Sequence, residues 1–227
     1  MVTLESWADG LLRRLPADPD ESIVFTPSDF PPLPESLGCD DLVIKHGFHD
    51  YDTWRVDYPQ WSGSREGFAA LGLAIVGVML LRHESVTVYL TSSHSEIRSL
   101  TILQPPALDH GTGLEVLPTR FHYSMSEIAR HPWTAYPPAP DELPWFKLTN
   151  AEDFVVTDQH RATRDRLHGF GGAPGSARFA RLLLDLSRPA NRIFEVALEC
   201  EAGFRGVAPA SAEVRLWLPG GDYWDAP

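Results

Sequence analysis

The stretch GFAALGLAIVGVMLL, from Gly67 to Leu81, decides the fold because it contains no charged or hydrogen-bonding side chain. A membrane-spanning helix needs about 20 apolar residues, so this stretch is too short to cross a bilayer. It is also too long for an ordinary strand, which has about 3–10 residues. We therefore expect a buried central helix over about residues 67–82. Gly72 and Gly77 inside it each cost roughly 1 kcal/mol relative to Ala, which indicates that neighbouring backbones pack closely there.

Alternating apolar and polar residues predict strands around this helix. The alternation is visible at residues 53–58 and 86–91, and it is cleanest at 194–201 and 212–218. Such a pattern is typical of strands with one buried and one wet face. The expected fold class is α+β, with a mainly antiparallel sheet packed on the buried central helix. Further helices are expected near residues 3–15, 159–168 and 176–187.

The chain of 227 residues has the length of a single domain. Its 43% hydrophobic content and seven Trp argue against a disordered chain. The Pro-rich stretch PWTAYPPAPDELP at residues 132–144 is the candidate boundary between two subregions, and a surface loop explains it equally well. We expect one α+β domain over residues 1–227.

The charge of the chain is negative and unevenly distributed. The formal net charge is −12, which argues against nucleic-acid binding because nucleic-acid binders concentrate Lys and Arg on one face. Residues 1–60 contain twelve acidic side chains against four basic ones, whereas residues 158–192 contain seven Arg against three Asp. An acidic face presented to a basic protein explains this arrangement, and so does a solvated surface that aids solubility.

The cysteine content and the first residues of the chain indicate the cellular compartment of the protein. Cys39 and Cys200 are the only cysteines, too few for a disulfide framework or a Cys-based zinc site. The opening sequence MVTLESWADGLLRRLP lacks the positive segment followed by an apolar one that is typical of signal peptides. We therefore expect a cytoplasmic protein that does not enter a membrane.

The first candidate for chemistry is a group of metal-ligand residues at His46, His49, Asp50 and Asp52. Neutral imidazole and carboxylate oxygen both offer lone pairs to a divalent metal at about 2.0–2.2 Å. We expect this segment to connect two strands, a position at which the four groups could converge. Gly, Asp and His also suit a plain tight connection, so a metal or acid–base site and a simple hairpin loop are both open.

The second candidate is the glycine-rich sequence HGFGGAPGS at His168–Ser176. Glycines let the backbone wrap around an anion, and the N-terminus of a following helix offers unpaired N–H donors. The predicted anion-binding residues are Arg164, Gly171, Gly172, Gly175, Ser176 and Arg178. A dinucleotide fingerprint requires a strand before the glycines, whereas we expect a helix there. A tight helix–helix connection with Gly169 as the C-cap is therefore the competing interpretation.

Aromatic residues at strand ends and in loops are the third candidate. Large rings in such places often anchor protein interfaces. The predicted partner-binding residues are Trp54, Trp61, Tyr223 and Trp224, with core packing as the alternative. The last two could also anchor a second copy of the chain and form a homodimer.

The sequence contains neither a G-x-S-x-G nor an H-E-x-x-H motif, nor a P-loop. The leading hypothesis is an acidic cytoplasmic protein without catalytic activity or cofactor that binds a protein with a basic surface. Such a protein could be an inhibitor, an immunity-type protein or an accessory subunit. The rival hypotheses are an enzyme that uses a metal or a phosphate group at the two segments above, and a small-molecule binding module with its pocket between the central helix and the sheet.

Overall fold

A computed structural model describes residues 1–51, 54–104, 119–125, 146–148, 165–171, 173–189, 195–198 and 214–218. The helices in these ranges are α1 (Leu4–Leu12), α2 (Arg65–Leu81) and α5 (Ala173–Ser187), with a 3₁₀ turn η1 at Pro27–Asp29. The strands are β1 (Ser22–Phe25), β2 (Ser36–Cys39), β3 (Leu42–Tyr51), β4 (Trp54–Gly63), β5 (Ser85–Leu90), β6 (Ser99–Leu103), β7 (Phe121–Ser124), β8 (Phe146–Leu148), β9 (Arg166–Gly171), β10 (Glu195–Leu198) and β11 (Val214–Trp217).

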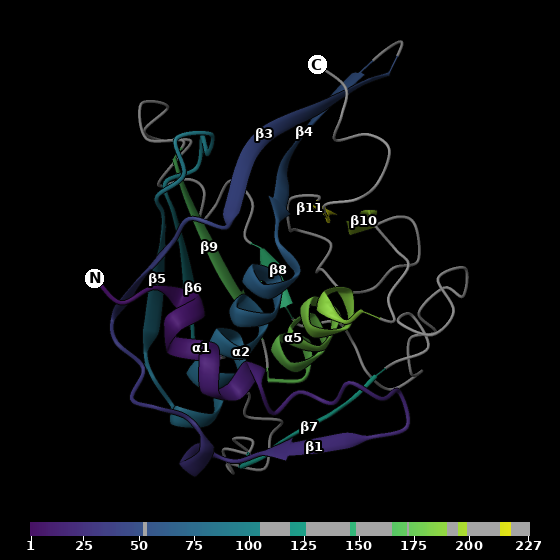
Figure 1. Ribbon diagram of the computed structural model, residues 1–227. Helices are drawn as coiled ribbons and strands as arrows, with labels where there is room; N and C mark the ends of the chain where they lie inside the picture. The colour runs from purple at the N-terminus through teal and green to yellow at the C-terminus, as the bar shows by residue number, and fades with distance from the viewer. Residues whose placement is uncertain are drawn as a thin grey trace, which may run out of the picture.

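The strands form three sheets, and the α+β class is confirmed. The largest sheet has the order β2-β5-β6-β9-β8, the second β10-β11-β4-β3, and the third pairs β1 with β7. The sheets are mixed, because β2 is parallel to β5, β6 to β9 and β4 to β11, while the other described pairs are antiparallel. The helices lie together on one side of the five-stranded sheet (Figure 1).

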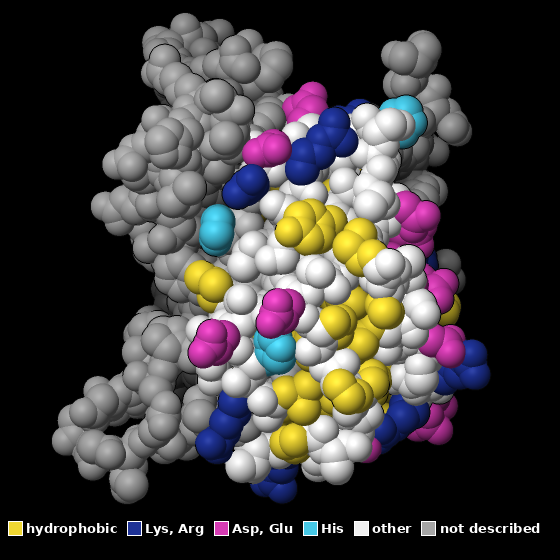
Figure 2. Space-filling model, turned by 90° about the vertical axis from the view of Figure 1, so that its left-hand side faces the viewer, with side chains coloured by type: hydrophobic (Ala, Val, Ile, Leu, Met, Phe, Trp, Pro, Cys, Tyr) yellow, Lys and Arg dark blue, Asp and Glu magenta, His cyan; other side chains and the backbone are white. Residues whose placement is uncertain are grey.

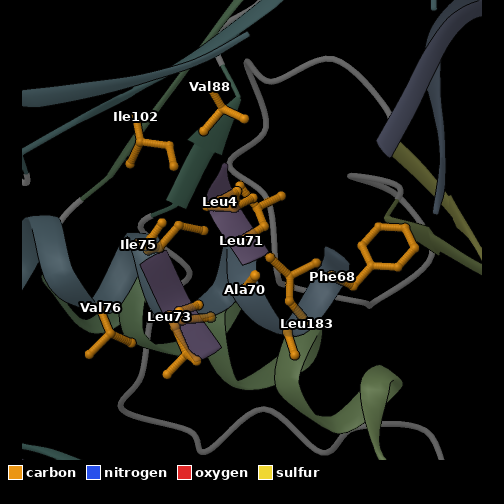
Figure 3. Packing of buried hydrophobic residues seen from close by; sticks show 14 of the residues in the cluster. Leu4, Phe68, Ala70, Leu71, Leu73, Ile75, Val76, Val88, Ile102 and Leu183 are labelled. Atoms are coloured by element: carbon orange, nitrogen blue, oxygen red, sulfur yellow. The ribbon is translucent and has the colours of Figure 1, made fainter. Parts of the chain in front are cut away.

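Helix α2 forms where the apolar stretch predicts a helix. The Ser64 side chain accepts a hydrogen bond from the Gly67 N–H at 2.9 Å, which satisfies a donor of the first turn. Every residue from Gly67 to Leu80 is buried. Side chains of α1, α2, α5, β5 and β6 converge around this helix (Figure 3). The core of the molecule is therefore built around α2.

Two glycines of α2 mark close packing against other helices. A methyl group at position 72 would lie 3.0 Å from the carbonyl oxygen of Ala180 in α5. A methyl group at position 77 would lie 3.1 Å from the indole ring of Trp7 in α1. The absence of a side chain at these positions lets α5 and α1 approach α2 closely. The close backbone expected from the sequence is present at Gly72, whereas the neighbours of Gly77 are aromatic side chains.

The five-stranded sheet has two different faces. Along β5, Val86, Val88 and Leu90 are buried, while Tyr89 is exposed. The same period of two continues in β9, where Arg166 is exposed and Leu167 is buried. The helical layer therefore covers the inward face, and we call the opposite side the outward face.

Two predictions about local structure need correction. β3 and β4 pair in register from Leu42 with Gly63 to Tyr51 with Trp54, so most of the expected His46–Asp52 loop is strand. This hairpin projects from the body of the molecule (Figure 1). Two residues are enough to connect antiparallel strands. The hydrogen-bonded pairing of β3 with β4 can therefore extend through most of the segment expected to be a loop.

The predicted helix at 159–168 is also wrong at its end, where residues 166–168 belong to β9. The strand forms because it pairs in parallel with β6, from Ser99 with Arg166 to Ile102 with Gly169. Residues 159–164 and the predicted boundary at 132–144 lie outside the described residues. Helices α1 and α5 match the helices expected near 3–15 and 176–187. No helix in the described ranges is long and apolar enough to cross a membrane.

Candidate functional site

The candidate site begins where α2 ends. Arg82 takes a left-handed conformation with φ of 54°, and the N–H groups of Arg82 and His83 both donate to the Val78 carbonyl oxygen. This arrangement satisfies a terminal carbonyl of the helix and reverses the chain sharply. The chain then enters β5 at Ser85, so the short α2–β5 connection leads directly into the strand between β2 and β6 of the five-stranded sheet.

A groove with a volume of about 620 Å³ opens beside this connection. Two stretches of the chain line it. The first is Glu35 with Ser36, where β2 begins, and the second runs from Leu81 at the end of α2 through Arg82, His83 and Glu84 to Ser85, Thr87 and Tyr89 of β5. We call this cavity the β2–β5 groove. It opens on the outward face of the sheet, away from the interior between α2 and the sheet, where a small-molecule pocket was expected.

The charged groups of the β2–β5 groove are open to solvent. Glu35, Glu84 and Arg82 are exposed, and none of them forms an ion pair with a residue that the structure describes. The carboxylates can therefore pair with a cation brought by a ligand. Arg82 adds one positive charge to the same rim.

Hydrogen bonding fixes the tautomer of His83. Its Nδ1 lies 2.7 Å from the Ser85 carbonyl oxygen. A carbonyl oxygen can only accept, so Nδ1 carries the proton and Nε2 is an acceptor in the neutral imidazole. The groove therefore combines two carboxylates with an imidazole whose Nδ1 is held by a backbone carbonyl.

Tyr89 supplies the large apolar surface of the groove. Its side chain is 45% exposed, and its strand neighbours Val88 and Leu90 are buried. A planar cation can stack on such a ring while a carboxylate pairs with its edge. The groove is therefore suited to a cationic group that carries some apolar surface.

Further exposed acids flank β2. Asp40 and Asp41 follow this strand, whereas Glu35 precedes it, and all three are exposed. Asp41 accepts a hydrogen bond from the Ser64 hydroxyl at 3.1 Å. The predicted concentration of negative charge at the start of the chain therefore extends to both ends of β2.

Other acids of the first segment are neutralised internally. Asp9 pairs with Arg13 at 2.5 Å, and Asp29 pairs with Arg14 at 2.7 Å. The Asp29 carboxylate also accepts from the hydroxyl and the N–H of Thr26, and these hydrogen bonds, with Arg14, lower the pKa of Asp29 to about 2. Asp29 stabilises the turn at η1 and is not available to a partner.

The predicted metal ligands lie on the hairpin. His46, His49 and Asp50 belong to β3, where they pair in register with Pro59, Val56 and Arg55, and Asp52 lies outside the described residues. Consecutive strand positions alternate between two faces, so position 49 is on the opposite face from positions 46 and 50. Among the side chains that the structure describes, no three of His, Cys, Asp or Glu are grouped to hold a metal ion. The metal site stays a prediction, which metal analysis of the purified protein and of His49→Ala can test.

The predicted anion-binding residues follow a strand. Gly171 ends β9, Gly175 and Ser176 lie in the first turns of α5, and Ser176 is buried. Arg178 belongs to α5, whereas Gly172 and Arg164 lie outside the described residues. The order strand, glycines, helix is the order that phosphate-binding turns require. The expected helix before the glycines was an objection to an anion site, and β9 removes that objection.

Of the predicted partner-binding aromatics, one lies in the core, one lies on the hairpin and two lie outside the described residues. Trp61 is 1% exposed and meets the Phe179 ring edge-on at a centroid distance of 6.3 Å, so it packs in the core. Trp54 is the first residue of β4 at the far end of the hairpin. Tyr223 and Trp224 lie outside the described residues.

Cys39 is a buried thiol without an evident chemical role. Its Sγ donates to the Glu5 carboxylate at 3.0 Å. Burial raises the pKa of Cys39 far above its usual range, and the neighbouring Glu5 raises it further. The thiol is therefore not a nucleophile in the folded protein.

Sequence reasoning missed the β2–β5 groove. His83, Glu84 and Tyr89 are near one another in the sequence, but Glu35 is remote from them and no motif joins the four. The outward position of Tyr89 in an alternating strand was the available signal, because a large ring on a wet face is an exposed apolar surface.

Comparison of the chain with models of protein families, with curated proteins and with solved structures finds no match. Function is therefore inferred from the residues of this chain and their arrangement. The features that bear on it are the exposed acids around β2, the groove beside them and the strand–glycine–helix order at β9 and α5.

Proposed function

We propose that this chain is a binding protein that docks a basic surface of another protein. The observation that carries the proposal is a set of exposed carboxylates in the first 41 residues with no ion pair to any described residue. These carboxylates belong to Asp18, Glu21, Glu35, Asp40 and Asp41. Their charge is therefore available to a partner.

Electrostatics explains why such a surface favours binding to a basic protein. The net charge of −12 produces a negative potential around the molecule. This potential accelerates encounter with a positively charged partner and repels acidic ones. Salt screens exposed charges over about 8–10 Å at physiological ionic strength, so association should weaken as the salt concentration rises.

The proposal can be tested with a charge-neutralised variant and a charge-preserving control. The first is Asp18→Asn/Glu21→Gln/Asp40→Asn/Asp41→Asn, and the second is Asp18→Glu/Glu21→Asp/Asp40→Glu/Asp41→Glu. Each protein is immobilised and exposed to a lysate of the source cells, and the retained proteins are identified by mass spectrometry at about 0.05 M and about 0.5 M NaCl.

We expect the wild type and the charge-preserving control to retain a basic protein at low salt and to release it at high salt. The neutralised variant should retain much less of it. A partner that is retained equally at both salt concentrations, or equally by the neutralised variant, would contradict the proposal.

One observation favours a second function, the binding of a phosphate group by the turn between β9 and α5. Helix α5 begins two residues after Gly171, the last residue of β9, and α/β sheets place phosphate-binding glycines between such a strand and helix. Titration with inorganic phosphate, followed by the NMR signals of the Gly171, Gly175 and Ser176 amides, tests it. Saturable shifts at these amides support phosphate binding, and unchanged signals at millimolar phosphate exclude it.

A further inference from the structure

We propose that the β2–β5 groove receives an arginine side chain of the basic partner, an inference that rests on the proposed function and names its contact site. Glu35 and Glu84 would pair with the guanidinium group, and Tyr89 would cover its planar face. The inference concerns a particular cavity, whereas the proposed function concerns the charge of the whole first segment.

The charges of the groove favour a cation. Glu35 and Glu84 outweigh Arg82, so the lining is net negative while His83 is neutral. Both carboxylates are exposed and have no ion pair with described residues. An incoming cation therefore need not break an existing ion pair to bind there.

Tyr89 favours a guanidinium over a compact ammonium. Guanidinium is planar and weakly hydrated, so it can stack on an aromatic face while its N–H groups donate to carboxylates. Tyr89 pairs in register with Gly38 of β2 and Ser99 of β6. Neither neighbour is large enough to cover the ring, which is consistent with its 45% exposure.

The surroundings of Tyr89 favour a protein partner over a small cation. A methyl group at position 38 would lie 2.9 Å from the Met1 side chain, so Met1 lies over Gly38, next to Tyr89. Met1 is 75% exposed, and Val2 is exposed as well. Figure 2 shows this side of the molecule, with a band of hydrophobic side chains and acidic side chains beside it. A single small ion would leave this apolar surface in water, whereas a protein would cover it.

The position of the groove leaves it accessible to a protein. The described helices lie on the other side of the five-stranded sheet (Figure 1). Thr87 and Thr101 are joined by a hydrogen bond of 3.1 Å, so the polar groups of the outward face are partly satisfied across β5 and β6. A partner can therefore dock on this face without burying these hydroxyl groups unpaired.

The test uses the peptide acetyl-Gly-Arg-Gly-amide as the probe and the same peptide with citrulline in place of Arg as its neutral counterpart. Binding to the full chain is measured by NMR titration. The variants are Glu84→Gln, Tyr89→Ala and Arg82→Gly. Glu66→Gln is the control, because it removes the same charge from an exposed residue outside both the groove and the acidic docking surface. Thermal unfolding of each variant checks that it is folded.

We expect the arginine peptide to bind at least about 3-fold more tightly than the citrulline peptide, because only the former offers a cation. Glu84→Gln and Tyr89→Ala should weaken its binding by about 2- to 5-fold. Arg82→Gly should strengthen it, since a repulsive charge is removed, and Glu66→Gln should leave it unchanged. Affinity for the arginine peptide should rise on substitution of Arg82 and fall on substitution of Glu84. This difference distinguishes a specific effect of charge from a general loss of structure.

The inference is overturned if wild type does not bind the arginine peptide, binds both peptides equally, or loses no affinity on substitution of Glu84 or Tyr89. Failure of the groove can be distinguished from failure of the proposed function. If the immobilised Glu84→Gln/Tyr89→Ala double variant retains the basic partner that the charge-neutralised variant loses, the groove is not the contact site and the proposed function stands.

Discussion

The two faces of β5 differ in burial. On the inward face, Val86, Val88 and Leu90 are buried against the helical layer. On the outward face, one residue away along the same strand, Tyr89 is exposed and lines the β2–β5 groove. The backbone hydrogen bonds are common to both faces, so the difference lies in the side chains alone.

Neighbouring residues of β5 should therefore differ in how much their substitution changes the free energy of unfolding. An inward side chain contributes to the free energy of unfolding through apolar burial. An outward side chain contributes little to folding and is available for binding. Substitutions on the two faces therefore test this difference.

The largest effect is expected at Gly72, in the helical layer that covers the inward face. Gly72→Val would place side-chain atoms against the carbonyl oxygen of Ala180, which a methyl group would already approach to 3.0 Å. We expect a loss of about 3 kcal/mol or more in the free energy of unfolding, measured by urea denaturation. Gly10→Ala is the control, because position 10 in α1 has nothing within 4 Å and should gain ~0.5–1 kcal/mol from helix propensity. Equal effects at the two positions would contradict the close packing of α2 and α5.

A direct comparison of the two faces uses adjacent residues of β5. Val88→Ala removes buried methyl groups and should cost about 2 kcal/mol of unfolding free energy. Tyr89→Ala should cost less than about 1 kcal/mol, because the ring is partly exposed already. Urea denaturation measures both. If Tyr89→Ala proved the more destabilising, the outward face would be part of the stable core and the comparison would be wrong.

A smaller, pH-dependent effect is expected at Asp29, in η1, which packs against α2. The folded-state pKa of about 2 lies below the unfolded value, so the carboxylate stabilises the fold fully above about pH 4. That contribution is lost as the pH falls toward 2. Asp29→Asn should therefore cost about 1 kcal/mol at neutral pH and almost nothing near pH 2, as measured by urea denaturation over this range. A constant loss at every pH would show that charge is not involved.

The smallest effect on stability is expected at Arg82, where the two regions meet. Its φ of 54° is a conformation that glycine adopts without strain. Arg82→Gly should raise the free energy of unfolding by ~0.5–1 kcal/mol, seen as a higher thermal midpoint. The same variant should bind the arginine peptide more tightly, so one substitution reports on both regions. A lower midpoint would mean that the Arg82 side chain makes a stabilising contact that outweighs the strain.

The core could be predicted from the sequence because its signal is local. The long apolar stretch predicted α2, and the alternation of apolar and polar residues at Ser85–Leu90 predicted β5. The strand β9 was missed because its parallel partner β6 is remote in the sequence, and only that pairing selects strand over helix at residues 166–168. The extent of β3 and β4 was missed for the same reason, since register is decided by pairing and not by composition.

The β2–β5 groove could not be predicted, because its lining joins residues 35–36 to the remote stretch 81–89. Glu84 and Tyr89 are near in sequence, but Glu35 reaches the groove only through the parallel pairing of β2 with β5. The acidic character of the first segment was readable from composition, and the spacing of Asp9 and Arg13 in the expected helix is that of an i,i+4 ion pair. The pairing of Asp29 with Arg14 was not readable, because it depends on the fold.

The most direct test of the central claim is the association rate constant with the basic partner retained in the capture experiment, measured between about 0.05 M and about 0.5 M NaCl. If exposed carboxylates guide binding, the rate constant should fall steeply with salt for the wild type and much less for the Asp18→Asn/Glu21→Gln/Asp40→Asn/Asp41→Asn variant. A rate constant that is the same at both salt concentrations, or equal salt dependence in the two proteins, would contradict the claim that this acidic surface is a docking surface.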